Sequence, residues 1–420
     1  MSKLPIKSKD FEENKKQKKS CILLYSGGVD TSICVYLLQK YYGYKVTTLS
    51  INVFQDKNWA QDMAKKAKQL GAEKTIVYEA KDIFANNYLS KVIKANAMYD
   101  DKYPLGTSMA RPMQAKIAVE IAIKEGADAI AHGCKGRGAD AFRLNMVFNY
   151  LLPKEMKLVM PINDWWPTRQ EEVDFAYENN IPVPVPQDNP FSYDDNIMSN
   201  AINYGVIDNI EKSPPEEAFK WTVPVDEAPN KAETIEIEFQ KGLPIKLNNK
   251  TMKLAELIQK LNIIGGKHGI GRIDMIENGL YGNKFRWVYE APAAEILIDA
   301  HKEIERLVFP KESLYFKHYV IDKQWTKLAY HSFFYSPLSS ALMSFIDIME
   351  QYVHGKVKIK LFKGKAWIMS RKTDDSLTKL DPKDIVAKEV MDIIPYGFEE
   401  YSFASKHESV IADYLGELKI

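Results

Sequence analysis

Apolar and polar positions over about the first 160 residues alternate between strand-like and helix-like spacings. The runs at 44–53, 75–78 and 129–132 predict strands, whereas the patterns at 59–70 and 115–124 predict helices. Strands separated by helices of this length favour a parallel sheet with right-handed crossovers. Ligands are then expected outside the carboxyl ends of the strands, at one edge of that sheet.

A different pattern follows the proline-dense stretch 181–190, which excludes helix and central strand and is read as the passage between domains. A loop-like stretch is expected as far as about residue 232. The later elements are predicted as strands at 234–239, 242–247, 356–361 and 366–369, and helices at 253–261, 292–307 and 338–352. This mixture favours an α+β second domain.

Length, charge and cysteine content narrow the class of protein. At 420 residues the chain suggests two or three domains with large cores. Lysine and arginine number 57 against 56 aspartate and glutamate residues, so we expect no nucleic-acid or membrane partner. The sequence has no apolar run of signal-peptide or membrane-span length, and its three cysteines are widely spaced, so we expect a cytoplasmic protein.

The first 20 residues form a lysine-rich run with few apolar side chains, namely Lys3, Lys7, Lys9, Lys15, Lys16, Lys18 and Lys19. Such a composition predicts a solvated, mobile tail, and a basic arm that binds a partner is the alternative.

The segment from Tyr25 to Ser32 carries the strongest chemical signal. It follows the apolar run 21–24 and precedes helical spacing, which predicts a strand, a glycine turn and a helix N-terminus that presents N–H groups to phosphate. Gly27 and Gly28 allow an anion to approach closely. Since the segment lacks a Gly-Lys-Ser/Thr ending, it resembles instead the pyrophosphate loop of enzymes that split ATP into AMP and pyrophosphate.

Further motifs narrow this resemblance, at 103–112, 131–143, 189–196, 266–278 and 288–292. In that order and spacing they resemble the argininosuccinate synthase family, over about residues 21–376. The resemblance implies adenylation of the ureido oxygen of citrulline by ATP, followed by displacement of AMP by the amine of aspartate. It also implies a homotetramer and four segments: a tail, a nucleotide-binding domain, a synthetase domain and an oligomerisation segment, at 1–20, 21–186, 187–378 and 379–420.

Carried over residue by residue, the resemblance implies an ATP site, with Mg²⁺ held through pyrophosphate at Asp30, formed by Tyr25, Ser26, Gly27, Gly28, Asp30, Thr31, Ser32, Ile51, Arg111 and Gly133. It implies an amino-acid site formed by Tyr103, Thr107, Ser108, Lys135, Ala139, Asp140, Arg143, Ser192, Ala201, Glu277 and Tyr289. The residues expected to carry catalysis are Asp30, Ser32, Arg111 and Asp140. Because positioning does most of the work in such a reaction, no protein general base is expected.

The amino-acid site departs from the family pattern. Lys135 replaces a threonine, Ala139 an asparagine and Ala201 a serine, and Asn145 stands for a glutamate. The lost side-chain contacts imply weaker discrimination, unless Lys135 binds an extra or displaced anionic group. The leading hypothesis is therefore an AMP-forming C–N ligase for altered amino-acid-like substrates.

The alternative is authentic argininosuccinate synthesis. A tRNA-modifying enzyme and a non-catalytic ATP-binding protein are weaker hypotheses, because the sequence shows no catalytic cysteine pair or basic RNA-binding module and the loop is intact.

Individual residues also have structural interpretations. Arg111 could be a surface residue, and Glu277 could pair with Arg272 or Arg286. Tyr103 and Tyr289 could be core aromatics, His132 is expected to be a packed structural histidine, and Cys134 a small filler.

Overall fold

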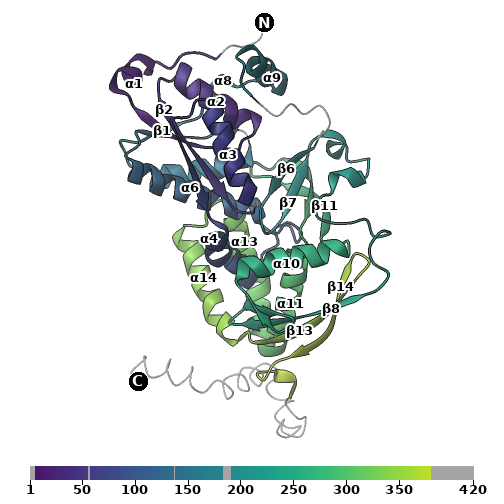
Figure 1. Cartoon of the computed structure of the whole chain (residues 1–420). Helices are drawn as coiled ribbons and strands as arrows, with labels where there is room; N and C mark the ends of the chain where they lie inside the picture. The colour runs from purple at the N-terminus through teal and green to yellow at the C-terminus, as the bar shows by residue number, and fades with distance from the viewer. Residues whose placement is uncertain (1–4, 55–56, 137, 183–190, 380–420) are drawn as a thin grey trace, which may run out of the picture.

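The computed structural model describes residues 5–54, 57–136, 138–182 and 191–379, in two regions (Figure 1). The first region is built on a five-stranded parallel sheet in the order β3-β2-β1-β4-β5. Its strands are Ser20–Leu24 (β1), Lys45–Asn52 (β2), Lys74–Glu79 (β3), Ala129–Ala131 (β4) and Lys157–Val159 (β5). The predicted parallel sheet is confirmed.

Helices pack on both faces of this sheet because successive residues point to opposite sides. Ile22 and Leu49 join one core cluster, and Leu23 and Val46 the other. The first cluster includes residues of α4 (Lys81–Phe84), η1 (Ala85–Leu89), α5 (Ser90–Lys94), α6 (Gly106–Glu125) and α7 (Ala139–Leu151). The second includes residues of α2 (Val29–Lys40), α3 (Lys57–Gln69), α8 (Pro161–Trp165) and α9 (Arg169–Glu178).

Helix α6 begins at Gly106, well before the start predicted at residue 115. The sequence expectation was wrong here because Pro112 normally interrupts a helix. In the structure the residues before this proline are buried, including Met109 and Ala110. Tertiary packing therefore stabilises a helical turn that local preference disfavours.

The predicted mobile tail is also corrected. Its residues 11–17 form a short helix, α1 (Phe11–Gln17), with Phe11 and Asn14 buried. The Asn14 side-chain amide donates to the carbonyl of Tyr42 at 2.9 Å, and the backbone N–H of Ser8 donates to the carbonyl of Tyr41 at 2.8 Å. This part of the segment is therefore bound to the first domain.

The second region holds two antiparallel sheets, in the orders β10-β9-β8-β13-β14 and β11-β12-β7-β6. Their strands are Ser192–Asp195 (β6), Asn200–Asn203 (β7), Glu233–Gln240 (β8), Leu243–Leu247 (β9), Lys250–Thr251 (β10), Arg272–Asn278 (β11), Lys284–Glu290 (β12), Gly355–Phe362 (β13) and Lys365–Lys372 (β14). The expected α/β domain followed by an α+β domain is confirmed. The four-stranded sheet was not predicted, since β6 and β7 are short and largely polar.

The helices of the second region are η2 (Gly205–Asp208), η3 (Glu216–Ala218), α10 (Leu254–Lys267), α11 (Pro292–Val308), α12 (Lys311–Tyr315), η4 (Phe316–Asp322), α13 (Lys323–Tyr330), α14 (Pro337–Met349), η5 (Glu350–Tyr352) and η6 (Leu377–Lys379). In Figure 1, α13 and α14 lie below the parallel sheet, next to α4 of the first region. Helix α13 is in contact with α6, and its last residue, Tyr330, lies 6.2 Å, ring centre to ring centre, from Tyr103, shortly before the start of α6.

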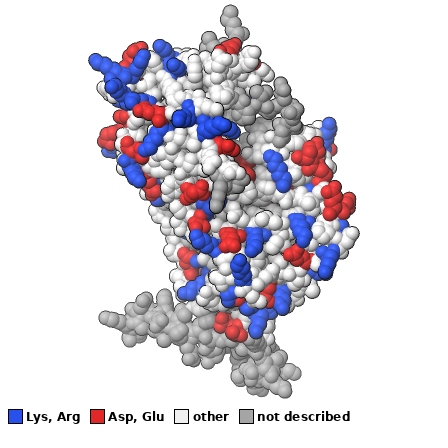
Figure 2. Space-filling view, viewed as in Figure 1, with Lys and Arg blue, Asp and Glu red and all other residues white. Residues whose placement is uncertain are grey.

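Most of the proline-dense passage, at 183–190, and the expected oligomerisation segment, at 380–420, lie outside the described residues. Figure 2 shows acidic and basic side chains interspersed over the visible face, with basic ones gathered at the upper left where α1 lies. Within the described part of the chain, none of the helices combines the length and the apolar character that a membrane crossing requires.

Candidate active site

The loop between β1 and α2 has the conformation that its sequence predicts. Gly28 is the N-cap of α2, and Gly27 has φ +76°, a left-handed conformation that favours glycine. No side chain of the described residues caps this helix, so its first N–H groups remain available to an anion. The hydroxyls of Ser26 and Thr31 lie 3.2 Å apart within the loop.

Other predicted ATP-site residues gather at the same edge of the sheet. Ile51 lies near the carboxyl end of β2, and the Tyr25 carbonyl accepts from the Ser50 hydroxyl at 2.9 Å. A Cβ on Gly133 would lie 3.3 Å from the carbonyl carbon of Asp30, so the chain leaving β4 touches the loop. Ser32 is 1% exposed, which makes it the least accessible of the predicted catalytic residues.

The carboxylate of Asp30 is linked to Lys135 through two residues of α9. Arg169 Nη1 lies 2.7 Å from Asp30 Oδ1 and 3.1 Å from Glu172 Oε2. Glu172 is 1% exposed and pairs with Lys135 Nζ at 2.9 Å, while the carbonyl of Pro167 accepts from the same ammonium at 3.0 Å. Lys135 therefore has two partners within the chain, a buried carboxylate and a carbonyl oxygen.

Arg111 joins the two regions. Its Nη2 donates to Asp140 Oδ2 at 2.9 Å and to Asp194 Oδ2 at 2.6 Å, which brings α6, α7 and β6 together. We call Arg111, Asp140 and Asp194 the Arg111 group. Burial raises the pKa of Asp140, but the charges of Arg111 and Arg143 outweigh it and lower the pKa overall. The alternative that Arg111 is a surface residue is wrong.

Next to this group lies a set of buried tyrosines and opposite charges, the acceptor cluster, formed by Tyr103, Ser108, Arg143, Glu277, Tyr289 and Tyr330. The Tyr103 hydroxyl accepts from the backbone N–H and the hydroxyl of Ser108 at 3.0 and 3.1 Å. The Arg143 guanidinium is 5.0 Å from the ring centre of Tyr330, and its Nη1 is 3.4 Å from Asp140 Oδ1.

Glu277 receives two tyrosine hydroxyls. Tyr289 donates to its Oε2 at 2.6 Å and Tyr330 to its Oε1 at 2.5 Å. Tyr289 also stacks on Tyr103, with ring centres 4.8 Å apart. Burial raises the pKa of Glu277, although the two hydroxyls and the charge of Arg143 oppose the rise.

Neither arginine proposed as a structural partner reaches Glu277. Arg272 donates to Glu216 at 2.9 Å, and Arg286 pairs with Asp274 at 2.6 Å. The ion-pair interpretation of Glu277 is therefore wrong.

The remaining predicted amino-acid residues lie beside these groups. Ala201 stands in register between Asp194 on β6 and Tyr289 on β12. Thr107 is buried in the first turn of α6, and Ala139 is the first residue of α7. Ser192 is exposed at the start of β6, two positions before Asp194 and on the same face of that strand.

Four residues of this site were missed by the sequence reasoning: Arg169, Glu172, Asp194 and Tyr330. Asp194 lies inside a motif already singled out at 189–196, so that motif could have supplied it. The other three lie outside every motif, and only the fold brings them to the site.

The expected structural histidine is confirmed. His132 is 1% exposed, accepts the backbone N–H of Cys134 at Nδ1 (3.1 Å), and contacts Asn145 Oδ1 through Nε2 (2.8 Å). With Nδ1 accepting, Nε2 carries the proton and donates to Asn145. Burial raises the pKa of Cys134 to about 12, consistent with a filler.

Family comparisons decide the identity of this fold. The family model of the arginosuccinate synthase N-terminal HUP domain matches residues 20–182, and that of the arginosuccinate synthase C-terminal domain matches residues 191–393. The chain belongs to the argininosuccinate synthase family. The resemblance inferred from the motifs is thus confirmed.

Relatives within this family are similar over most of their length. The argininosuccinate synthase of Pyrococcus furiosus is 45% identical over 356 residues, which cover 85% of each chain. That of Listeria innocua is 44% identical over 360 residues, covering 86% of this chain and 88% of the relative. A solved structure of a U34-tRNA thiolase from Methanococcus maripaludis matches 43% of this chain and 67% of its own, at 19% identity and a TM-score of 0.29, too weak a likeness to carry an argument.

Proposed function

We propose that this protein is an ATP-dependent C–N ligase that joins citrulline to aspartate, forming argininosuccinate, AMP and pyrophosphate. The observation that carries the proposal is the juxtaposition of an intact pyrophosphate loop with a buried cluster that holds Arg143 and Glu277. Arg143 has one carboxylate oxygen at 3.4 Å, and Glu277 accepts from two tyrosine hydroxyls. An amino acid offers a matching carboxylate and ammonium.

In the first step, the citrulline ureido oxygen attacks the α-phosphorus of ATP and pyrophosphate leaves. The N–H groups at the start of α2 and the hydroxyls of Ser26 and Thr31 bind the departing phosphates. Asp30, a carboxylate at this edge, fits Mg²⁺ as an oxygen ligand, and the bound ion would supply charge neutralisation there. Ile51 and Gly133 flank the nucleotide, and Arg111 completes its site.

In the second step, the aspartate amine attacks the activated ureido carbon, and AMP leaves with the bonding electrons of the C–O bond. Asp140 contacts both Arg111 and Arg143 of the acceptor cluster, which supports a role for Asp140 in orienting the amine. Positioning of three reactants carries the rate enhancement, with no protein general base assigned.

Argininosuccinate synthesis explains the chain better than altered substrates. Relatives at 43–45% identity over about 86% of this chain are named argininosuccinate synthase. Lys135, the most conspicuous departure from the family pattern, is neutralised by Glu172 and adds no unpaired cation. Ala139 and Ala201 then modify the edges of the amino-acid site without changing its charges.

The proposal extends to a cytoplasmic homotetramer with small-molecule substrates only. Sedimentation of the purified protein would check the assembly.

The decisive assay measures AMP and pyrophosphate from ATP with citrulline, with aspartate, and with both. We expect full turnover only with both amino acids, and ATP–pyrophosphate exchange with citrulline alone. A panel of other ureido, amide and carboxyl acceptors provides the contrast. Faster turnover of another acceptor would restore the altered-substrate hypothesis, and release of ADP with orthophosphate would exclude the ligase.

A further inference from the structure

Tyr330 stands between the two opposite charges of the acceptor cluster. Its hydroxyl donates to Glu277 Oε1 at 2.5 Å, and its ring lies against the Arg143 guanidinium at 5.0 Å. Its backbone carbonyl accepts from Arg143 Nε at 3.4 Å. One residue thus contacts both charges, through three different groups.

We propose that Tyr330 is a positioning residue for the acceptor amino acid, and that a buried charge cluster around Lys317 fixes the helix that carries it. The proposal rests on the function proposed above and assigns to that site a residue outside every motif of the sequence.

Arg143 and Glu277 are both buried and form no ion pair with each other. Arg143 is 5% and Glu277 4% exposed, and a direct ion pair between them would consume the charges that an amino acid needs. Tyr330 instead satisfies Glu277 with a neutral hydroxyl and Arg143 with a ring face and a carbonyl oxygen. Tyr330 thus contacts each of the two side chains without replacing either charge by an ion pair between them.

Tyr330 is held in place by a second tyrosine ring. Its ring stacks on Tyr99 with centres 3.6 Å apart and planes 1° from parallel. Tyr330 ends α13, which continues directly from η4, and Tyr99 follows shortly after α5. The two stacked rings therefore depend on the relative position of two segments from different regions.

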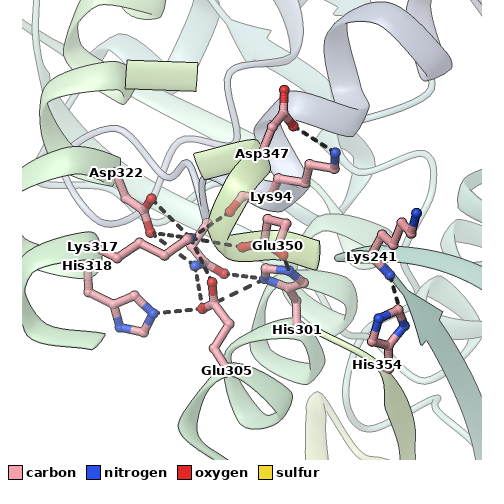
Figure 3. Close-up of polar contacts among 11 residues, drawn as sticks. Lys94, Lys241, His301, Glu305, Lys317, His318, Asp322, Asp347, Glu350 and His354 are labelled. Carbon is pink, nitrogen blue, oxygen red and sulfur yellow. Dashed lines mark hydrogen bonds and ion pairs between the residues drawn. The ribbon is translucent and has the colours of Figure 1, made fainter. Parts of the chain in front are cut away.

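Those segments meet at the Lys317 cluster, defined as Asn96, His301, Glu305, Lys317, Asp322 and Glu350. Figure 3 shows the last five of these residues and contacts among them. Lys317 Nζ lies 2.6 Å from Glu305, 3.1 Å from Asp322 and 3.2 Å from Glu350. It also donates to the carbonyl of Lys94 at 2.8 Å. Lys317 itself has no exposed surface, so this lysine is tied to α11, η4, η5 and the end of α5 at once.

Asn96 adds the side chain of the first region to the cluster. Its amide donates to Glu305 at 2.7 Å and to Asp322 at 3.1 Å, and its Oδ1 contacts His301 Nδ1 at 2.8 Å. Asn96 precedes Tyr99 and Asp322 precedes Tyr330, so the same cluster anchors the two segments that carry the stacked rings. Asn96 itself has φ +45°, which asparagine and glycine tolerate.

The cluster is complete without a metal ion. Its carboxylates and imidazoles are groups that bind metals, and His301, Glu305 and Glu350 offer atoms within 4.8 Å of one another. However, the Lys317 ammonium already lies among three carboxylates and supplies the positive charge. We therefore assign the Lys317 cluster a structural role, which is to hold the helix that carries Tyr330.

The test compares Tyr330→Phe with Tyr335→Phe in the full-length protein. The Tyr335 hydroxyl lies 2.7 Å from the Tyr88 hydroxyl and donates to the carbonyl of Pro112 at 3.4 Å, and Tyr335 lies outside the acceptor cluster. Loss of one hydrogen bond to a charged group predicts an increase of about 10- to 100-fold in the KM and Kd of citrulline for Tyr330→Phe. The KM of ATP is expected to change less than about twofold, and Tyr335→Phe to leave both constants unchanged.

A cycle with Asn96→Gly tests the supporting cluster, since glycine keeps the backbone conformation and removes the amide. We expect this variant to raise the citrulline KM about three- to tenfold in the wild-type background and to add nothing to Tyr330→Phe. Additive effects would overturn the link between the cluster and Tyr330. An unchanged citrulline Kd in folded Tyr330→Phe, or an equal rise in the Kd of ATP, would overturn the role of Tyr330. A wild-type protein that neither binds citrulline nor forms AMP from it would overturn the proposed function and this inference with it.

Discussion

Two buried groups of charges in this molecule pair their charges in opposite ways. In the Lys317 cluster, one ammonium faces three carboxyl groups at 2.6 to 3.2 Å, and His301 contacts Glu350 at 2.8 Å, so every member has a partner within the chain. In the acceptor cluster, Arg143 reaches a single carboxylate oxygen at 3.4 Å, and Glu277 receives only neutral hydroxyls. The contrast teaches that incomplete pairing, rather than burial or charge, separates a site for a ligand from a support of the fold.

The physical reason is the cost of desolvation. A buried charge needs nearby opposite charge or several hydrogen bonds. Where the chain supplies them, a ligand has nothing to add, and where the chain withholds them, an amino acid with its own carboxylate and ammonium can complete the set.

Removing the central cation gives the largest expected effect. Lys317→Met leaves three carboxyl groups without their ammonium and is expected to lower the free energy of unfolding by about 3–5 kcal/mol. Lys253→Met, at an exposed pair with Asp82, is the control, with a change below about 1 kcal/mol. Thermal melting measures both, and similar shifts in the two variants would contradict the closed character of the cluster.

Substitutions in the Arg111 group should lower activity rather than stability. Arg111→Lys keeps the charge but cannot hold Asp140 and Asp194 with one planar fork, so we expect kcat/KM to fall about 100-fold with little change in melting temperature. Arg272→Lys is a matched control, because both arginine side chains are 19% exposed and pair with a carboxylate. Equal losses of activity in the two variants would refute a special role for Arg111.

The Lys317 cluster and the Arg111 group should also differ in the sign of their pH dependence. Burial raises the pKa of Asp322 from 3.8 to about 7, so the folded protein retains a proton that the unfolded chain loses near pH 4. The contribution of this residue to stability therefore falls as pH rises from about 4 to about 7. At Asp140, burial is outweighed by Arg111 and Arg143 and the pKa is lowered, so its contribution is present above about pH 4 and is lost as pH falls through the lowered pKa.

Melting temperature measured against pH checks both signs. Relative to the wild type, Asp322→Asn should remove a loss of stability as pH rises from about 4 to about 7, whereas Asp140→Asn should remove a loss of stability as pH falls below about 4. Asp347→Asn, at a half-exposed aspartate, controls for the loss of a carboxylate. Parallel curves for the two buried aspartates would contradict the assignment.

The smallest effect is expected at Lys135. Because Glu172 and the carbonyl of Pro167 hold its ammonium, Lys135→Thr should change the KM of aspartate by less than about threefold. Steady-state kinetics at saturating ATP and citrulline measures it. A tenfold change would mean that the lysine contacts the second substrate, and would place it with the open charges.

The sequence alone predicted the pyrophosphate loop, the parallel sheet and most residues of the proposed amino-acid site. These signals are local: Gly27 and Gly28 follow a strand and precede a helix, and the period-two pattern at 234–239 matches β8, where Ile235, Ile237 and Phe239 are buried. Where a local rule and packing disagreed, as at Pro112 within α6, the sequence reasoning failed.

Only the tertiary structure decided which charges are neutralised. The partners that settle this question are far apart in the chain: Asp194 for Arg111, Tyr330 for Arg143 and Glu277, and Lys317 for Glu350. No periodicity or motif spacing encodes such pairs, because they form only when helices and sheets pack against one another. The sequence predicted a phosphate site at the start of α2, whereas packing between the two regions determined which buried charges are paired within the chain.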